Sequence, residues 1–170
     1  MAFNFTTVQK YSKYDIILIM KIYLDSCCYN RPYDDQNYLS ISLETQAKLL
    51  IQLLIKEKRL DLASSFILDY ENSCNPYSDR KIAVKNFLDT NVSDYIGSEK
   101  SEEVITKAKI VMAAGVKMKD SCHIVCAEMM KCDYLLSTDK RMLKYKSDTI
   151  RLLNPIEFID LLNRGNESDD

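Results

Sequence analysis

The chain has 170 residues, a net charge of −2 and a hydrophobic content of 46%, which suits one globular domain with a substantial core. This charge excludes proteins that bind nucleic acid through a broad basic surface. No apolar run approaches the ~20 residues that span a membrane, and no secretory signal precedes the six cysteines. We therefore expect a cytoplasmic protein without a membrane partner, whose reduced cysteines act mainly as small buried hydrophobes.

The first half of the chain predicts two strands and a long helix. Residues 1–15 are polar and aperiodic and precede an apolar run, and we expect an N-terminal extension over residues 1–20. The apolar "KIYLD" at 21–25 is typical of a short buried parallel strand that ends in an acid. After the loop "CCYNRPYDDQN", apolar residues recur at helical spacing over 39–59. "LASSFILDYE" at 62–71 indicates a second strand that ends at the start of a short helix.

The second half continues this alternation of helices and strands. Ser78 or Asp79 can cap a helix at 80–89, "SDYIGS" indicates a short strand, and an amphipathic helix ends at Gly115. Asp120 stands where a helix cap belongs, before "SCHIVCAEMMK". The remaining expected elements are a strand in "CDYLLSTD", a helical turn in "KRMLKY", a strand in "TIRLL" and a helix in "NPIEFIDLLNR", with Asn154 as cap and Pro155 at the first helical position.

This order of elements predicts the fold class. Strands alternate with helices five times, which indicates a three-layer α/β/α domain over residues 21–163 with a mostly parallel five-stranded sheet. A polar tail at 164–170 follows. In such sheets a functional site lies outside the C-terminal ends of the strands.

The stretch "DSCHIVCAEMMKC" at 120–132 combines one histidine with three cysteines and raises the question of a zinc site. Zinc needs four converging ligands, usually from two short clusters, and the chain contains no CxxC pair. The apolar residues around the cysteines favour a buried helix instead. His123 is the only histidine, and without a GxSxG serine we read it as a partly buried, hydrogen-bonded residue rather than as the base of a nucleophilic site.

Four acidic residues are predicted to meet at one edge of the sheet. Asp25 and Asp139 end strands, Glu71 follows the second strand, and Asp120 begins the helix that leads into the strand at 132–139. Each acid alone is explained by helix capping. Together they would repel one another, and Mg²⁺ or Mn²⁺ bound by their oxygens would compensate.

A divalent cation at these acids suits the hydrolysis of a phosphodiester bond. Metal ions lower the pKa of water and stabilise charge on the phosphate, so neither a protein nucleophile nor a glycine-rich loop is required. Thr138, with Ser137 as the alternative, could orient the water or a metal ligand. Asn30 and Arg31 could contact an RNA phosphate, although Arg31 could equally pair with Asp34 or Asp35.

At these residues the chain resembles the PIN-domain family of metal-dependent nucleases, over about Lys21 to Leu162. The resemblance rests on "KIYLDSCCYNRPYDDQ", "SSFILDYENSCNP", "KMKDSCHIVCAEMMKCDYLLSTDKRML" and "IRLLNPIEFIDLL". Its most specific pieces are Asp25, the D-x-x-H-[IV]-x-x-A start at Asp120 and the S-T-D ending at Asp139.

The resemblance implies a Mg²⁺- or Mn²⁺-dependent ribonuclease in which Asp25, Glu71, Asp120 and Asp139 take the acidic positions. Many bacterial members are toxins held inactive by a small antitoxin, and many dimerise, which adds an antitoxin and a second copy of the chain to RNA as candidate partners. Asp69 and Glu44 are alternatives to Glu71, whereas Asp133 precedes its strand and is expected at the opposite edge.

Three other functions compete with the nuclease. A catalytically inactive PIN-like binding module would keep the fold without the metal. A phosphatase with an aspartyl nucleophile would need a second acid two residues after Asp25, where Cys27 stands. In a purely structural protein the acids would be helix caps, and the protein would act through an interface.

Overall fold

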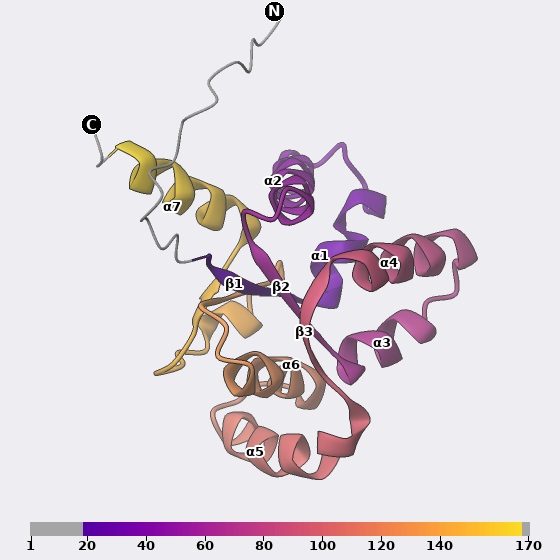
Figure 1. Cartoon of the computed structure of the whole chain (residues 1–170), viewed down its shortest axis with the longest axis vertical. Helices are drawn as coiled ribbons and strands as arrows, with labels where there is room; N and C mark the ends of the chain where they lie inside the picture. The colour runs from indigo at the N-terminus through magenta and orange to yellow at the C-terminus, as the bar shows by residue number, and fades with distance from the viewer. Residues whose placement is uncertain (1–18, 168–170) are drawn as a thin grey trace, which may run out of the picture.

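The computed structural model describes residues 19–167, so most of the predicted N-terminal extension and the last three residues of the predicted tail lie outside the described residues. Five parallel strands form one sheet in the order β3-β2-β1-β4-β5 (Figure 1). The strands are β1 (Lys21–Leu24), β2 (Asp61–Ser65), β3 (Val92–Ile96), β4 (Tyr134–Leu136) and β5 (Arg151–Leu153). The predicted α/β class and the parallel five-stranded sheet are confirmed.

Helices cover both faces of the sheet, as Figure 1 shows, so the three-layer arrangement is also confirmed. The α-helices are α1 (Ser26–Asn30), α2 (Leu39–Lys56), α3 (Phe66–Ser73), α4 (Ser78–Asn91), α5 (Ser101–Ala113), α6 (Met118–Met129) and α7 (Pro155–Glu167). Three 3₁₀ turns are η1 (Arg31–Tyr33), η2 (Ser98–Lys100) and η3 (Met142–Lys144). Within residues 19–167, no helix combines the length and the apolar character needed to cross a bilayer.

The alternation of side chains along β1 divides the core into two clusters. Tyr23 faces α5 and α6 and packs in a cluster with Ile124. Ile22 and Leu24 face the other layer, where α1, α2, α4 and α7 contribute residues such as Ile51 and Phe158. All six of these side chains are fully buried, which fits a central strand covered on both faces.

Two of the predicted helix ends are confirmed. Asn154 caps α7, because its Oδ1 accepts the Ile156 N–H at 2.9 Å while the Glu157 carboxylate accepts the Asn154 N–H at 2.9 Å. Gly115 follows α5 with a φ of 92°, a conformation that glycine adopts without strain. The α7 helix continues to Glu167, three residues beyond the predicted end at 164.

Other predicted boundaries are wrong. The second strand ends at Ser65, and the apolar Phe66 begins α3, because a short apolar run alone does not distinguish a strand from a buried helix. Ser78 lies inside α4, so neither predicted cap precedes that helix. Lys117 holds the cap position of α6, and Asp120 lies in its first turn, where an acid still suits the helix dipole.

Candidate metal centre

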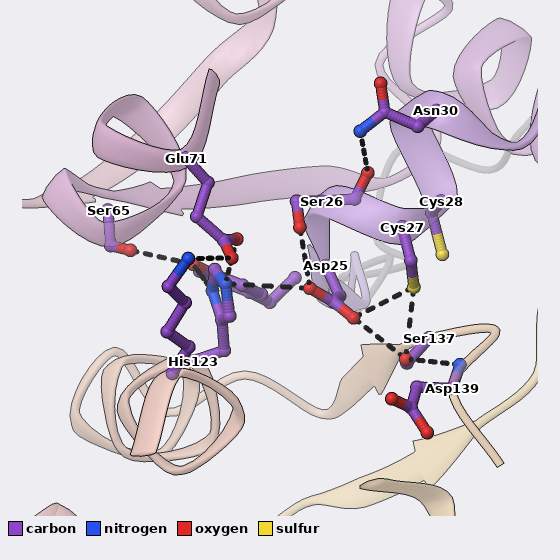
Figure 2. Close-up of polar contacts among 12 residues, drawn as sticks. Asp25, Ser26, Cys27, Cys28, Asn30, Ser65, Glu71, His123, Ser137 and Asp139 are labelled. Atoms are coloured by element: carbon purple, nitrogen blue, oxygen red, sulfur yellow. Dashed lines mark hydrogen bonds and ion pairs between the residues drawn. The ribbon is translucent and has the colours of Figure 1, made fainter. Parts of the chain in front are cut away.

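Three side chains from different elements converge beyond the C-terminal ends of β1 and β2. Asp25 follows β1, Glu71 lies on α3 after β2, and His123 lies on α6. Each offers one ligand atom, and these atoms all lie within 4.8 Å of one another. The His123 Nε2 is 2.7 Å from the Glu71 carboxylate and 3.6 Å from Asp25 Oδ1 (Figure 2). The parallel sheet therefore assembles the centre at its predicted edge.

Hydrogen bonds on both ring nitrogens fix the orientation of His123. Its Nδ1 is 2.7 Å from the Tyr23 hydroxyl, which in turn is 2.7 Å from the Ser65 hydroxyl. Burial alone would lower the pKa of His123, but the hydrogen bond to Glu71 and the nearby Asp25 and Asp120 carboxylates outweigh burial and raise that pKa. These carboxylates thus favour the protonated form of the imidazole.

The carboxylate of Glu71 is matched to this imidazole. Burial would raise the pKa of Glu71, but its hydrogen bond to His123 and the charge of that ring lower it overall. The Lys119 ammonium, 3.8 Å from the second carboxylate oxygen, acts in the same direction. Glu71 is therefore held as an anion at the edge of the centre.

Asp25 is held from the side opposite His123, as Figure 2 shows. Its Oδ2 accepts hydrogen bonds of 2.9 Å from the Ser137 hydroxyl and 2.9 Å from the Cys27 thiol. The Ser137 oxygen also accepts the backbone N–H of Asp139 at 3.0 Å. Because Oδ2 is occupied in this way, Oδ1 is the oxygen that faces His123. Asp25 is only 5% exposed, so this arrangement is shielded from water.

Asp120 and Asp139 lie beside this group of three rather than within it. Burial raises the pKa of Asp120, and the negative charges of Asp25 and Asp139 raise it further. Asp139 is oriented by the backbone N–H of Arg141, which it accepts at 2.7 Å. The structure thus brings all four predicted acids to one edge, with Asp25 and Glu71 in the tightest grouping.

The acids considered as alternatives have other partners. Asp69 accepts the Tyr95 hydroxyl at 2.7 Å. Glu44 forms an ion pair of 2.9 Å with the Arg31 Nε and accepts the Asn154 amide at 2.7 Å. Neither joins the centre, so Glu71 is the acid that completes it.

Asp133 lies at the opposite edge of the sheet from the candidate centre, as expected. The Asp133 carboxylate accepts the backbone N–H of Lys21 at 2.7 Å, at the N-terminal end of β1. This contact links the loop before β4 to the central strand, which is the structural role expected for Asp133.

Three other predicted residues have mixed placements. Ser137, not Thr138, donates to Asp25, and Thr138 joins the network through its backbone N–H, 3.2 Å from the Cys27 sulfur. Asn30 donates to the Ser26 carbonyl at 3.1 Å and lies near the centre (Figure 2). Arg31 points elsewhere and is paired at 2.9 Å with Asp34 and at 2.9 Å with Glu44. The internal pairing left open for Arg31 is the one observed.

The three cysteines of the stretch at 120–132 lie in the core. Cys122, Cys126 and Cys132 are buried in the cluster between the sheet and the α5–α6 layer. Burial raises the pKa of Cys126 and of Cys132 to about 12, which disfavours the thiolate that zinc requires. They act as apolar filling, as predicted.

His123 is the site residue that sequence reasoning missed. Its spacing of three from Asp120 places both on neighbouring positions of one helix face, which was the available signal. Comparison of the sequence with protein-family models gives no match, and comparison with curated proteins gives none either. The chemistry of the centre must therefore carry any assignment of function.

Proposed function

We propose that the protein is a divalent-metal-dependent endoribonuclease. The observation that carries this proposal is the convergence of the Asp25 and Glu71 carboxylates with His123, beside Asp120 and Asp139, at the C-terminal edge of a parallel sheet. The resemblance of the sequence to the PIN-domain nucleases at these same acids supports the choice of reaction.

The donor set fits a hard divalent cation. Carboxylate oxygens are the preferred ligands of Mg²⁺ and Mn²⁺, and a nearby imidazole is compatible with Mn²⁺. The raised pKa of Asp120, caused by burial and by Asp25 and Asp139, marks an excess of negative charge that a cation would relieve. Asp25, Glu71, Asp120 and Asp139 would hold the ion. When bound, such an ion supplies Lewis acidity toward the phosphate and a lowered pKa of water.

The residues of the chain contribute orientation and a proton acceptor. Ser137 and Cys27 fix Asp25 by donating to its Oδ2, and His123 fixes Glu71. A carboxylate oxygen of this group that is not bound to the ion would accept the proton of the attacking water. Attack of water on phosphorus with departure of the 3′ oxygen leaves a 5′-phosphate and a 3′-hydroxyl.

A paired metal-binding and cleavage experiment tests this proposal. Mn²⁺ should raise the melting temperature of the wild-type protein and support cleavage of a single-stranded RNA. Asp25→Asn should abolish both effects. Asp133→Asn, which changes an acid at the opposite edge of the same sheet, should leave both intact. If the wild-type protein neither responds to Mn²⁺ nor cleaves RNA, the proposal is wrong and the fold would serve as a binding module.

The proposed activity leads to further proposals about where the protein acts and which partners it binds. We place its action in the cytoplasm, where its RNA substrate is found. Unrestrained cleavage would damage the host, so control by a small antitoxin, as in many PIN-domain proteins, follows from the resemblance. The same resemblance leads us to propose a homodimer, and light scattering on the purified protein would measure its oligomeric state.

A further inference from the structure

A cleft of about 350 Å³ adjoins the candidate metal centre and is lined from α1, α3 and α4. Glu71 belongs to the centre and also lines the cleft, and the Ser26 hydroxyl, which lines it too, lies 3.4 Å from Asp25 Oδ1. This volume is at the lower end of small-molecule sites, roughly 300 to 1,000 Å³. The cleft is thus wide enough for one small polar ligand next to the acids.

Arg80 offers an unpaired cation in the wall of this cleft. Its guanidinium carbon lies 3.9 Å from the ring centroid of Tyr77 and 4.6 Å from that of Tyr33. No ion pair or side-chain hydrogen bond within residues 19–167 involves Arg80, whereas Arg31 pairs with two carboxylates. Contacts with two rings orient the guanidinium while leaving its N–H donors available, the arrangement that suits a phosphate.

Three asparagines line the same cleft, and hydrogen bonds hold two of them together. Asn30 donates to the Ser26 carbonyl at 3.1 Å and accepts the Asn75 amide at 3.3 Å. The Asn72 amide donates to the Lys81 carbonyl at 3.0 Å, while its Oδ1 has no hydrogen-bond partner among the described residues. A side-chain amide of this kind can pair with the edge of a base.

We propose that this cleft binds one unpaired nucleotide of the RNA, next to the phosphate that is cleaved. Arg80 and Lys119 contact the flanking phosphate, and the Asn72 amide contacts the edge of the base. A base inside a duplex is stacked and paired and cannot enter such a cleft. The inference rests on the proposed function, because it takes RNA as the ligand of the adjoining centre.

The test measures RNA binding without cleavage. Fluorescence anisotropy with a short 5′-labelled single-stranded RNA in EDTA compares the wild-type protein with Arg80→Gln. Arg80→Gln loses one ordered phosphate contact, so it should bind the RNA about tenfold more weakly. The negative slope of the logarithm of the binding constant against the logarithm of the salt concentration should become shallower by about 0.7. Arg151→Gln is the matched control, because Arg151 also lies over a tyrosine ring, 5.7 Å from the Tyr134 centroid, but on β5. It should bind like the wild type.

Further measurements separate the outcomes. Arg80→Lys, which keeps the charge and loses the planar guanidinium, should bind with intermediate affinity, and melting curves confirm that both variants fold. Equal binding by Arg80→Gln and wild type overturns the subsite, as does equal affinity for the same RNA in a duplex. If the wild type does not cleave RNA in Mn²⁺ but Arg80→Gln still weakens binding, the nuclease assignment fails and the subsite stands.

Discussion

Replacing Lys48 by methionine should stabilise the protein. Lys48 lies on α2, is 5% exposed, and its ammonium nitrogen is 5.8 Å from the centroid of the Tyr29 ring. Burial lowers the pKa of Lys48 from 10.5 to about 8, partly offset by Cys28 and reinforced by Lys56. Near pH 7 the folded protein therefore carries a buried charge that the unfolded chain exposes to water. Methionine has a similar length and no charge.

The size of the effect follows from this pKa. A fall from 10.5 to about 8 corresponds to roughly 3 kcal/mol of lost stability in the charged form. Subtracting about 1 kcal/mol for the cation–π contact with Tyr29 leaves a gain of about 2 kcal/mol for Lys48→Met. For a domain of this size, that gain raises the melting temperature by about 4–8 °C.

The pH dependence gives the sharper test. Between about pH 8 and pH 10.5 the unfolded chain binds a proton at Lys48 that the folded protein lacks, so the wild type gains stability as the pH rises. The advantage of Lys48→Met, measured by urea denaturation, should be largest near pH 7 and mostly gone near about pH 9.5.

Lys56 provides the control for this experiment. It lies on the same helix and its ammonium also approaches an aromatic ring, that of Phe87 at 5.9 Å, but it is exposed. Lys56→Met should change stability by less than about 0.5 kcal/mol. A Lys48→Met variant that is less stable than the wild type at neutral pH, or whose advantage does not vary with pH, would refute this reasoning.

Three further predictions concern the site and its surroundings. Glu71→Gln should abolish the rise in melting temperature caused by Mn²⁺, whereas Asp69→Asn should retain it; the reverse result would assign the wrong acid to the centre. Ser137→Ala should weaken Mn²⁺ binding about tenfold in a titration while the fold is kept, because it removes a donor that orients a ligand, and unchanged affinity would exclude this role. Arg31→Ala should destabilise the protein by about 3 kcal/mol in urea denaturation, since it leaves the buried Glu44 carboxylate without its cation; a loss below about 1 kcal/mol would contradict this pairing.

The fold was predictable because its signals are local. The strands β1 and β4 are short apolar runs, Asp25 directly follows β1, and Asp139 lies three positions after the end of β4. Parallel strands bring their C-terminal ends to one edge, so these acids could be placed together before any coordinates were known. The boundary at Ser65 was missed because strand and helix share one continuous apolar run there.

The site residues that were missed depend on distant contacts. The role of His123 follows from Tyr23 and Glu71, which are 100 and 52 positions away. Thr138 was favoured over its neighbour Ser137, which is the residue that contacts Asp25. Adjacent residues at the end of a strand point in opposite directions, so a difference of one residue in register decides which of the two reaches Asp25. For Arg31, the pair with the nearby Asp34 was anticipated, but the pair with Glu44, which lies 13 positions away on α2, was not.

The position of β1 at the centre of the sheet has a consequence for the growing polypeptide. Asp25 is synthesised before Ser137, the residue whose hydroxyl holds it, which lies 112 positions later. Until β4 has been made, one edge of β1 lacks its neighbour and Asp139 has not been added. Under the proposed function, a chain that ends before β4 lacks both Ser137 and Asp139 and is therefore unable to cleave RNA. The proposed activity would arise only after most of the domain has been synthesised.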